Sequence, residues 1–199
     1  VLATPPYVRI SRMIRDISAT DILVGNKHTN LRQMVEQELT SEDVASRVQE
    51  IRFREINQQQ VRAAELTLQD FTYTTAVSDE HFLQWVTADN KIAGFCRLSL
   101  PHWDKLTAGV CDVAANELLV QPGQAMIREL HVYGQALSLG SEGMSAQHQG
   151  LGQKLLAKAS SIAAEAGYTS LNVISSIGTR AYYRAQGFID AGLYQQKAL

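Results

Sequence analysis

One short segment of the sequence places two glycines at the start of a helix. Gln147-His148-Gln149-Gly150-Leu151-Gly152 leads into an amphipathic stretch that predicts a helix from about residue 150 to 166. Glycines let a backbone approach a ligand closely, and the first N–H groups of a helix have no partner within it. With the helix dipole, such N–H groups form a pocket for a phosphate or pyrophosphate. The alternative is a helix start that binds no ligand, and the absence of a G-x-x-x-x-G-K-S/T pattern disfavours an NTPase.

The rest of the sequence predicts the elements that position this segment. Strands are predicted around 52–56, 66–75, 80–88, 92–100, 125–133, 169–174 and from 188 onward, and 8–17 is consistent with a strand or a short helix. Helices are predicted at 31–39 with Asn30 as N-cap, from Thr40 or Ser41, and at 150–166 and 177–186. Turns are predicted at Asp89-Asn90 and Gln121-Pro122-Gly123. This order predicts an α+β fold with a mixed, mostly antiparallel sheet and flanking helices.

The strand before the glycine segment carries polar side chains at regular spacing. Alternation along a strand predicts two faces: Ile127, Glu129, His131 and Tyr133 on one, and Arg128, Leu130 and Val132 on the other. Two interpretations of Glu129 and His131 stay open. They act as a general base or position a water, or they hold the sheet to a preceding domain or pair with an arginine.

A second segment, from Gly178 to Phe188, follows the glycine segment by about 30 residues and has the sequence GTRAYYRAQGF. The spacing and order resemble the GNAT acetyltransferase superfamily, in which a Q/R-x-x-G-x-G/A loop binds the pyrophosphate of acetyl-CoA. The resemblance implies that Tyr183 lies near the thioester sulfur, where a phenol can protonate the leaving thiolate. Its neighbour Tyr182 lies about 100° away on the helix and is expected to contact the pantetheine arm or the core. The alternative for both tyrosines is aromatic packing.

The resemblance implies a complete site. Its catalytic residues are Tyr183, Glu129 and His131, and backbone N–H groups of the strand at 127–133 polarise the thioester carbonyl. Its acetyl-CoA-binding residues are Leu130, His131, Val132, Gln147, Gln149, Gly150, Leu151, Gly152, Gln153, Tyr182 and Tyr183. The Gly/Ser-rich loop at 134–146 is predicted to be a mobile lid over the acetyl group.

Three segments in the same order resemble, more narrowly, the acetyltransferase domain of the Elongator catalytic subunit family. They are RELHVYG at 128–134, QHQG at 147–150 and GTRAYYR at 178–184. The start of the chain, at 5–17 and 30–32, resembles the tail of the radical SAM domain that precedes this domain in the family. The expected division is residues 1–50 as a C-terminal tail of the radical SAM domain with linker helices, and residues 51–199 as the GNAT-like domain.

The family resemblance implies a function in tRNA modification. An upstream radical SAM domain, with S-adenosylmethionine and an iron–sulfur cluster, attaches the acetyl group to carbon 5 of the wobble uridine, which leads to 5-carboxymethyluridine. The domain in this chain binds acetyl-CoA and promotes hydrolysis of its thioester when tRNA is bound. Implied partners are tRNA, the upstream domain and, in a eukaryote, other Elongator subunits. The alternatives are a stand-alone protein or small-amine N-acetyltransferase, and a non-catalytic acyl-CoA-sensing or tRNA-docking module.

The sequence departs from the family in its cysteines. The radical SAM cysteine cluster is absent and the first residue is Val1, so the chain is expected to be a fragment or a truncated relative. Many family members have a C-x-C-x-x-C-like zinc motif where residues 48–55 here are VQEIRFRE, which predicts no metal. Cys96 and Cys111 are the only cysteines, which excludes a disulfide scaffold and favours a reducing cytoplasm. Both are expected to be buried and without a role in the chemistry.

Composition and charge exclude further classes. The chain has 199 residues, 45% hydrophobic and 19% charged, which is typical of one globular domain with or without an appendage. No apolar run approaches the ~20 residues of a membrane-spanning helix, so no membrane partner is expected. A net charge of −2 does not indicate nucleic acid through bulk charge. Arg9, Arg12 and Arg15 are candidates to bind RNA phosphates, and ion pairs with Asp16, Asp21 or a domain interface are the alternative.

Overall fold

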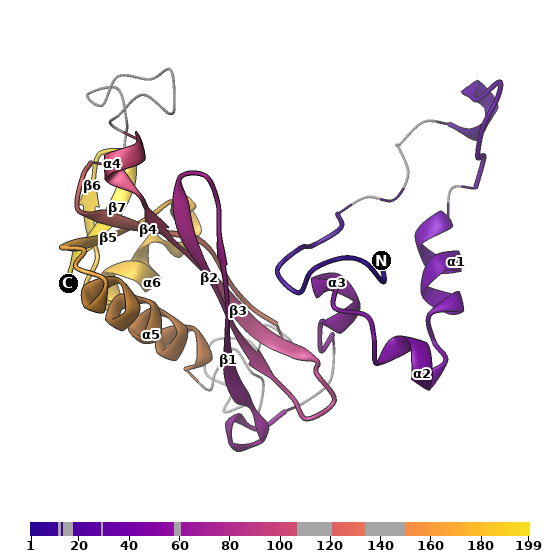
Figure 1. Cartoon of the computed structure of the whole chain (residues 1–199), viewed down its shortest axis with the longest axis horizontal. Coiled ribbons are helices and arrows are strands. Elements are labelled where there is room, and N and C mark those ends of the chain that lie inside the picture. Colours follow the sequence, from indigo (N-terminus) through magenta and orange to yellow (C-terminus); the bar gives the residue numbers. More distant parts are fainter. Residues whose placement is uncertain (12, 14–17, 29, 58–60, 107–120, 134–149) are drawn as a thin grey trace. The chain divides into compact units, whose positions relative to one another are not determined.

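The structure is a computed structural model that describes the chain except for residues 12, 14–17, 29, 58–60, 107–120 and 134–149 (Figure 1). The described residues form two compact units, one of Val1–Glu55 with Asp89–Lys91 and the other of Ile56–Ala88 with Ile92–Leu199. The predictions for Arg12, Arg15, Cys111, Gln147, Gln149 and the loop at 134–146 lie outside the described residues. Among the helices that are described, none combines the length and the apolar character needed to cross a bilayer.

The first unit is helical. Its elements are η1 (Ala19–Asp21), α1 (Leu31–Glu38), α2 (Glu42–Ala45) and α3 (Ile51–Arg54). The helix predicted at 31–39 is confirmed as α1, with Asn30 at its N-cap position, although the Asn30 side chain makes no capping hydrogen bond. The strand predicted around 52–56 is wrong, because α3 occupies residues 51–54. The Glu50 side chain caps this helix by accepting the Phe53 N–H, which outweighs the strand preference of the local sequence.

A buried carboxylate crosslinks the first unit. Glu50 is fully buried, and its side chain accepts the N–H of Ile10 at 2.6 Å and that of Phe53 at 2.9 Å. The guanidinium of Arg32 lies 3.5 Å from the same carboxylate. Residues 8–11 form neither the strand nor the helix that the sequence predicts. The backbone N–H of Ile10 is hydrogen-bonded to the Glu50 side chain instead of to a neighbouring strand or turn.

Arg54 is the second buried charge of this unit. Its guanidinium donates to the carbonyl of Gln49 at 3.0 Å, to that of Pro6 at 3.1 Å and to the Asn90 side chain at 2.9 Å. Burial lowers the pKa of Arg54 to about 10, and the nearby Glu50 carboxylate acts in the opposite direction. Asn90, with φ of +63°, belongs to the hairpin turn that the sequence predicts.

The second unit is a seven-stranded sheet with helices. Its strands are β1 (Thr67–Thr74), β2 (Ser78–Val86), β3 (Ile92–Pro101), β4 (Gln124–Val132), β5 (Ser170–Val173), β6 (Ile189–Ala191) and β7 (Tyr194–Ala198). Its helices are η2 (Ala63–Glu65), α4 (Trp103–Lys105), α5 (Leu151–Glu165), η6 (Ile177–Thr179) and α6 (Arg180–Ala185). The strand order is β1-β2-β3-β4-β5-β7-β6, and of the described pairs only β4 and β5 run parallel. The predicted mixed, mostly antiparallel sheet is confirmed, and the segment from 188 onward forms two strands.

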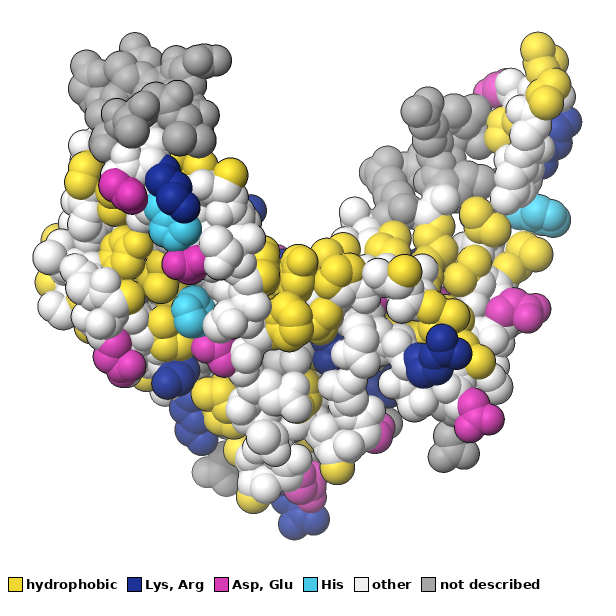
Figure 2. All heavy atoms as spheres, viewed as in Figure 1, with side chains coloured by type: hydrophobic (Ala, Val, Ile, Leu, Met, Phe, Trp, Pro, Cys, Tyr) yellow, Lys and Arg dark blue, Asp and Glu magenta, His cyan; other side chains and the backbone are white. Residues whose placement is uncertain are grey.

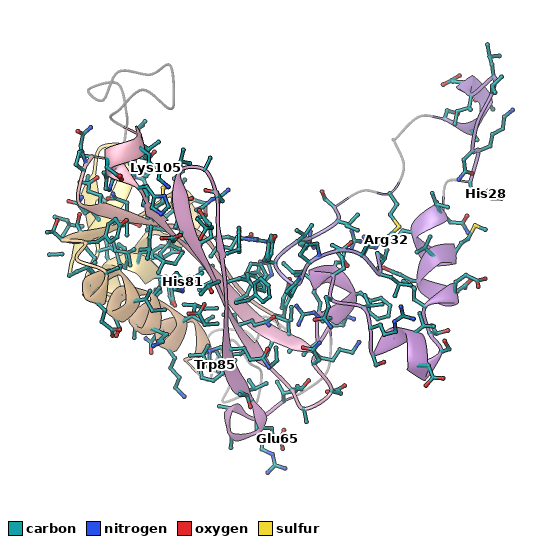
Figure 3. All side chains as sticks on the ribbon, viewed as in Figure 1. His28, Arg32, Glu65, His81, Trp85 and Lys105 are labelled. Carbon is teal, nitrogen blue, oxygen red and sulfur yellow. The ribbon has the colours of Figure 1, made fainter. Side chains whose placement is uncertain are left out.

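The long helix α5 covers one face of the sheet (Figure 1). Its buried side chains lie on one stripe, as the sequence predicts: Leu151, Leu155, Leu156, Ala159 and Ala163. Burying a leucine contributes roughly 1.5–3 kcal/mol, so this stripe is the main attachment of the helix. Trp85 on β2 fixes the helix start, since its indole N–H donates to the Leu151 carbonyl at 3.3 Å (Figure 3).

A β-bulge interrupts β4 beside the site. Arg97 of β3 pairs with Glu129 and the next residue of β3, Leu98, pairs with Ile127, so Arg128 has no opposite residue. The extra residue reverses the alternation of side chains. Ile127 and Leu130 therefore both pack into the core under α5, and the prediction that Ile127 shares a face with Glu129 is wrong.

Candidate functional site

A cavity of about 630 Å³ opens in the second unit where the start of α5, the end of β4 and the start of α6 meet. Its lining residues are Leu130, Val132, Gly150, Gly152, Gln153, Gly178, Thr179, Tyr182 and Tyr183. The volume lies in the range of small-molecule and cofactor sites. Seven of these nine residues are predicted cofactor-binding residues. Gly178 and Thr179 are missed, although both belong to the motif that the sequence singles out at 178–188.

The start of α5 is built to receive an anion. Gly150 has φ of +68°, a left-handed conformation that favours glycine, and its carbonyl accepts the first helical hydrogen bond from Lys154 at 3.1 Å. The N–H groups of Leu151, Gly152 and Gln153 therefore precede the first hydrogen bond of the helix. No acidic residue lies in this first turn. The helix dipole and these N–H groups favour a negatively charged group at this end of the cavity.

The strands β4 and β5 separate beside the cavity. Their parallel pairing ends at Ile127, next to the bulge at Arg128. The Tyr133 N–H donates to Ala93 of β3 at 2.9 Å, and N–H groups alternate between the two edges of a strand. The N–H of Leu130 consequently points to the side from which β5 has diverged, where it can donate to a carbonyl oxygen of a ligand.

Two tyrosines of α6 face the cavity. Tyr183 is only 7% exposed, and its ring packs edge-on against Phe188 with centroids 5.5 Å apart. Burial, with smaller contributions from Cys96 and Tyr182, raises the pKa of Tyr183 to about 12. Tyr182 is half-exposed, and burial followed by Cys96 raises its pKa as well. Both phenols stay protonated at neutral pH and can donate a proton or a hydrogen bond.

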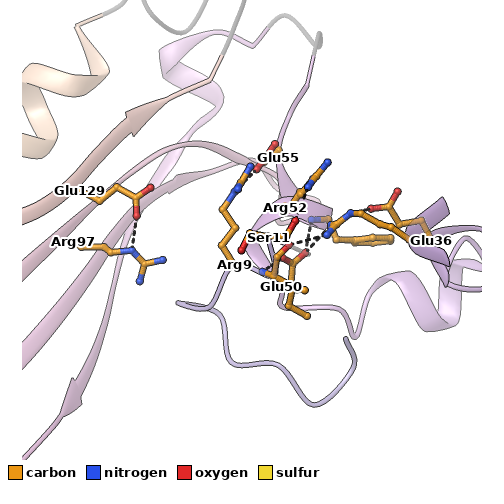
Figure 4. Close-up of polar contacts among 11 residues, drawn as sticks. Arg9, Ser11, Glu36, Glu50, Arg52, Glu55, Arg97 and Glu129 are labelled. Atoms are coloured by element: carbon orange, nitrogen blue, oxygen red, sulfur yellow. Dashed lines mark hydrogen bonds and ion pairs between the residues drawn. The ribbon is translucent and has the colours of Figure 1, made fainter. Parts of the chain in front are cut away.

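The structure does not bring Glu129 or His131 to the cavity. By register they lie opposite Arg97 and Phe95, on the face of the sheet away from α5. Glu129 accepts a hydrogen bond from the Arg97 Nε at 2.8 Å (Figure 4). His131 stacks on Phe95 and contacts the Tyr133 ring, with centroids 5.9 and 4.4 Å apart. For Glu129 this arrangement corresponds to the alternative of pairing with an arginine.

The other predicted site residues are dispersed. The side chain of Leu151, which is 1% exposed, packs in a core cluster and leaves only the backbone N–H of this residue for a ligand. Arg9, in the first unit, pairs through its Nε with Glu55 at 3.1 Å (Figure 4). Figure 2 shows both basic and acidic side chains on the face in view. RNA binding by Arg9 stays a prediction.

The donor set of the cavity fits acetyl-CoA. Its lining combines the open first turn of α5 with a buried, protonated phenol, as a diphosphate and a thioester require. Within the described parts of the chain, no three His, Cys, Asp or Glu side chains gather in a metal-binding arrangement. Cys96 is fully buried, and desolvation raises the pKa of its thiol, so it is not a nucleophile at neutral pH.

Comparisons with known proteins identify the family of the chain. Residues 48–188 match the acetyltransferase (GNAT) family. The tRNA uridine(34) acetyltransferase of Dehalococcoides mccartyi is 41% identical over 98% of this chain and 41% of its own length. Elongator complex protein 3 of Danio rerio is 32% identical over 98% of this chain and 35% of its own.

The chain is also similar to a solved structure. The archaeal Methanocaldococcus infernus Elp3 with an N-terminal deletion aligns with a TM-score of 0.79 and 28% identity, over 100% of this chain and 46% of that one. The chain thus spans less than half the length of these relatives. Because the family match runs from the first unit through the sheet, α5 and α6, the chain belongs to the acetyltransferase (GNAT) family and is similar over nearly all of its length to the tRNA uridine(34) acetyltransferase and Elongator complex protein 3.

Proposed function

We propose that this chain binds acetyl-CoA and serves as the acetyltransferase domain of an enzyme that modifies the wobble uridine of tRNA. The observation that carries the proposal is a cavity lined both by the open first turn of α5 and by Tyr183. The similarity to a tRNA uridine(34) acetyltransferase over 98% of the chain supports tRNA as the substrate.

The cavity residues divide by the part of the cofactor that they would hold. The N–H groups of Leu151, Gly152 and Gln153 would bind the diphosphate. The space between β4 and β5 would take the pantetheine arm, and the Leu130 N–H is the donor assigned to the thioester carbonyl. When bound, the cofactor supplies an activated acetyl group as a thioester.

Tyr183 would act as the general acid. Its phenol lines the cavity, is nearly inaccessible to bulk water and keeps its proton because its pKa is raised to about 12. Donating that proton to the sulfur as the carbon–sulfur bond breaks would avoid the release of a bare thiolate.

The described lining residues include no general base. None of the nine is Asp, Glu, His or Lys, and Glu129 and His131 lie on the other face of the sheet. A stand-alone amine N-acetyltransferase needs a base to deprotonate its amine. A thioester hydrolysis that waits for tRNA suits this cavity better, since the group that activates water can arrive with the RNA or with another domain.

The remaining chemistry falls, in this proposal, to an upstream radical SAM domain that carries S-adenosylmethionine and an iron–sulfur cluster. The curated relatives are more than twice as long as the matched region, since it covers 41% and 35% of them. Proposed partners are tRNA and, in a eukaryotic setting, other Elongator subunits, and the proposed place of action is the cytoplasm.

Thioester hydrolysis tests the proposal directly. We expect the full protein to release CoA from acetyl-CoA when tRNA is added, and to show little release without tRNA or with a lysine peptide. The control is tRNA lacking a uridine at the wobble position. Acetylation of the peptide without tRNA would instead support the amine acetyltransferase, and acetyl-CoA binding without any turnover would support the non-catalytic module.

Substitutions at Gly150 separate a backbone role from a ligand role. Gly150 lines the cavity with φ of +68°, and an added Cβ would meet the Gln153 Oε1 at 3.4 Å. Asparagine tolerates this conformation, whereas valine is strained by about 1–2 kcal/mol. We expect Gly150→Asn and Gly150→Val both to weaken acetyl-CoA binding by about tenfold or more, with only the valine lowering the melting temperature.

Calorimetry and thermal unfolding measure the two effects at Gly150 separately. Wild-type affinity in Gly150→Asn would mean that the glycine serves only the backbone at the start of α5. That result would contradict a ligand in contact with this residue.

A further inference from the structure

We infer that the Tyr182 hydroxyl donates a hydrogen bond to the diphosphate of the cofactor, and that Gly152 is required because it leaves room for this hydroxyl. The inference rests on the acetyl-CoA site proposed above. It places Tyr182 at the diphosphate end of the cavity, whereas the sequence predicts contact with the pantetheine arm or the core.

The position of the hydroxyl follows from Gly152, the second residue of α5. A Cβ on Gly152 would lie 2.6 Å from the Tyr182 Oη, 3.6 Å from its Cζ and 3.5 Å from the Val132 Cγ2. The first distance is shorter than real Cβ contacts allow, whereas the other two are ordinary contacts. The phenol oxygen therefore occupies the space of the missing side chain, directly against the first turn of the helix.

The Tyr182 hydroxyl adds a hydrogen-bond donor to the N–H groups of the first turn of α5. It lies against Gly152 in the first turn of α5, and Tyr182 lines the cavity with 37% of its surface exposed. Among the described residues, no acceptor is hydrogen-bonded to this hydroxyl. Several donors facing one cavity, in a turn without an acidic residue, suit a ligand group that carries only acceptors and negative charge. The diphosphate is the part of acetyl-CoA with that chemistry.

The inference assigns the two adjacent tyrosines to different parts of the cofactor, Tyr182 to the diphosphate and Tyr183 to the thioester. Their rings are nearly perpendicular, at 79° with centroids 5.3 Å apart. Tyr183 packs edge-on against Phe188 in the core, and the proposed function assigns its hydroxyl to the thioester. Tyr182 lies across the helix start, which is the end where the diphosphate would bind.

A comparison of two ligands tests the inference. Acetyl-CoA carries the diphosphate, whereas acetyl-pantetheine has the same thioester and arm without it. In the full protein, we expect Tyr182→Phe to weaken acetyl-CoA binding by about tenfold, as for a hydrogen bond to a charged group, and to leave acetyl-pantetheine affinity unchanged. Tyr168→Phe is the matched control, because its hydroxyl donates to Pro101 outside the cavity, and it should alter neither affinity.

A double-mutant cycle tests the role of Gly152. Gly152→Ala should weaken acetyl-CoA binding in the wild type by displacing the phenol, and should cost much less in the Tyr182→Phe background, where the atom at 2.6 Å is gone. An equal loss in both backgrounds would mean that the Cβ blocks the cofactor itself, which would overturn the inference.

The failure of the inference differs from failure of the proposed function. Unchanged acetyl-CoA affinity in Tyr182→Phe, or an equal loss for acetyl-pantetheine, overturns the assignment of Tyr182 alone. A wild-type protein that does not bind acetyl-CoA overturns the cofactor site and the inference together.

Discussion

Replacing Tyr183 by phenylalanine should lower tRNA-dependent thioester cleavage by about 10²- to 10⁴-fold, the usual contribution of a general acid. The ring packs against Phe188 and Tyr182 with little exposure, and phenylalanine fills the same space. The free energy of unfolding and the affinity for acetyl-CoA should therefore stay close to those of the wild type. Rates under saturating acetyl-CoA, combined with calorimetry, separate loss of the acid from loss of binding.

The pH dependence gives an independent check on Tyr183. Burial raises the pKa of its phenol above the ordinary value of 10, to about 12, so the acid form is lost only as the pH rises through about 12. The enzyme-dependent rate should not fall with a midpoint near pH 10. A fall at that pH that is absent from Tyr183→Phe would show a phenol open to solvent and contradict the buried acid. Wild-type turnover in Tyr183→Phe would show that Tyr183 contributes only packing and does not act as an acid.

The elements around the cavity were predictable where the sequence pattern that specifies them spans only a few residues. The glycines before α5, the stripe of leucines along it and the turn at Asp89-Asn90 each lie within a few residues of one another. The sequence therefore predicts the helix, its open first turn and the hairpin correctly. Tyr182 and Tyr183 could also be placed at the site, because a short motif at the start of α6 carries them.

The faces of β4 were not predictable, because they depend on another strand. Alternation predicts a clean division of side chains, but the pairing with β3 leaves Arg128 as an extra residue. The bulge turns Leu130 to the α5 face and Glu129 to the opposite face, where Arg97 binds it. A bulge is set by the register of two strands distant in sequence, and neither strand alone reveals it.

The contact of Tyr182 with Gly152 escapes sequence analysis for the same reason. Both residues belong to recognisable motifs, but the 2.6 Å spacing arises only when α6 is packed beside the start of α5. The buried charges of the first unit are similar, since Glu50 lies 40 residues from the Ile10 N–H that it accepts. No local pattern around Glu50 predicts that its carboxylate is fully buried.

Replacing Glu50 by alanine should destabilise the first unit by about 3–5 kcal/mol, the cost of removing one partner from a buried charged network. The carboxylate is fully buried, accepts the N–H groups of Ile10 and Phe53, and offsets part of the desolvation of Arg54. Its removal leaves two N–H donors and a buried guanidinium without their acceptor or counter-charge. Denaturant unfolding followed by circular dichroism measures the loss.

Glu36 provides the matched control for Glu50, because both carboxylates contact Arg32. The Glu36 Oε1 lies 2.6 Å from the Arg32 Nε, closer than the 3.5 Å between Glu50 and the same guanidinium, but its side chain is 38% exposed. An exposed i,i+4 pair contributes only about 0.3–0.5 kcal/mol, so Glu36→Ala should be nearly neutral. Equal losses in the two variants would show that the ion pair with Arg32 governs stability. A large loss of unfolding free energy in Glu50→Ala alone would show that the stabilisation comes from the burial of Glu50 and from its hydrogen bonds to backbone N–H groups.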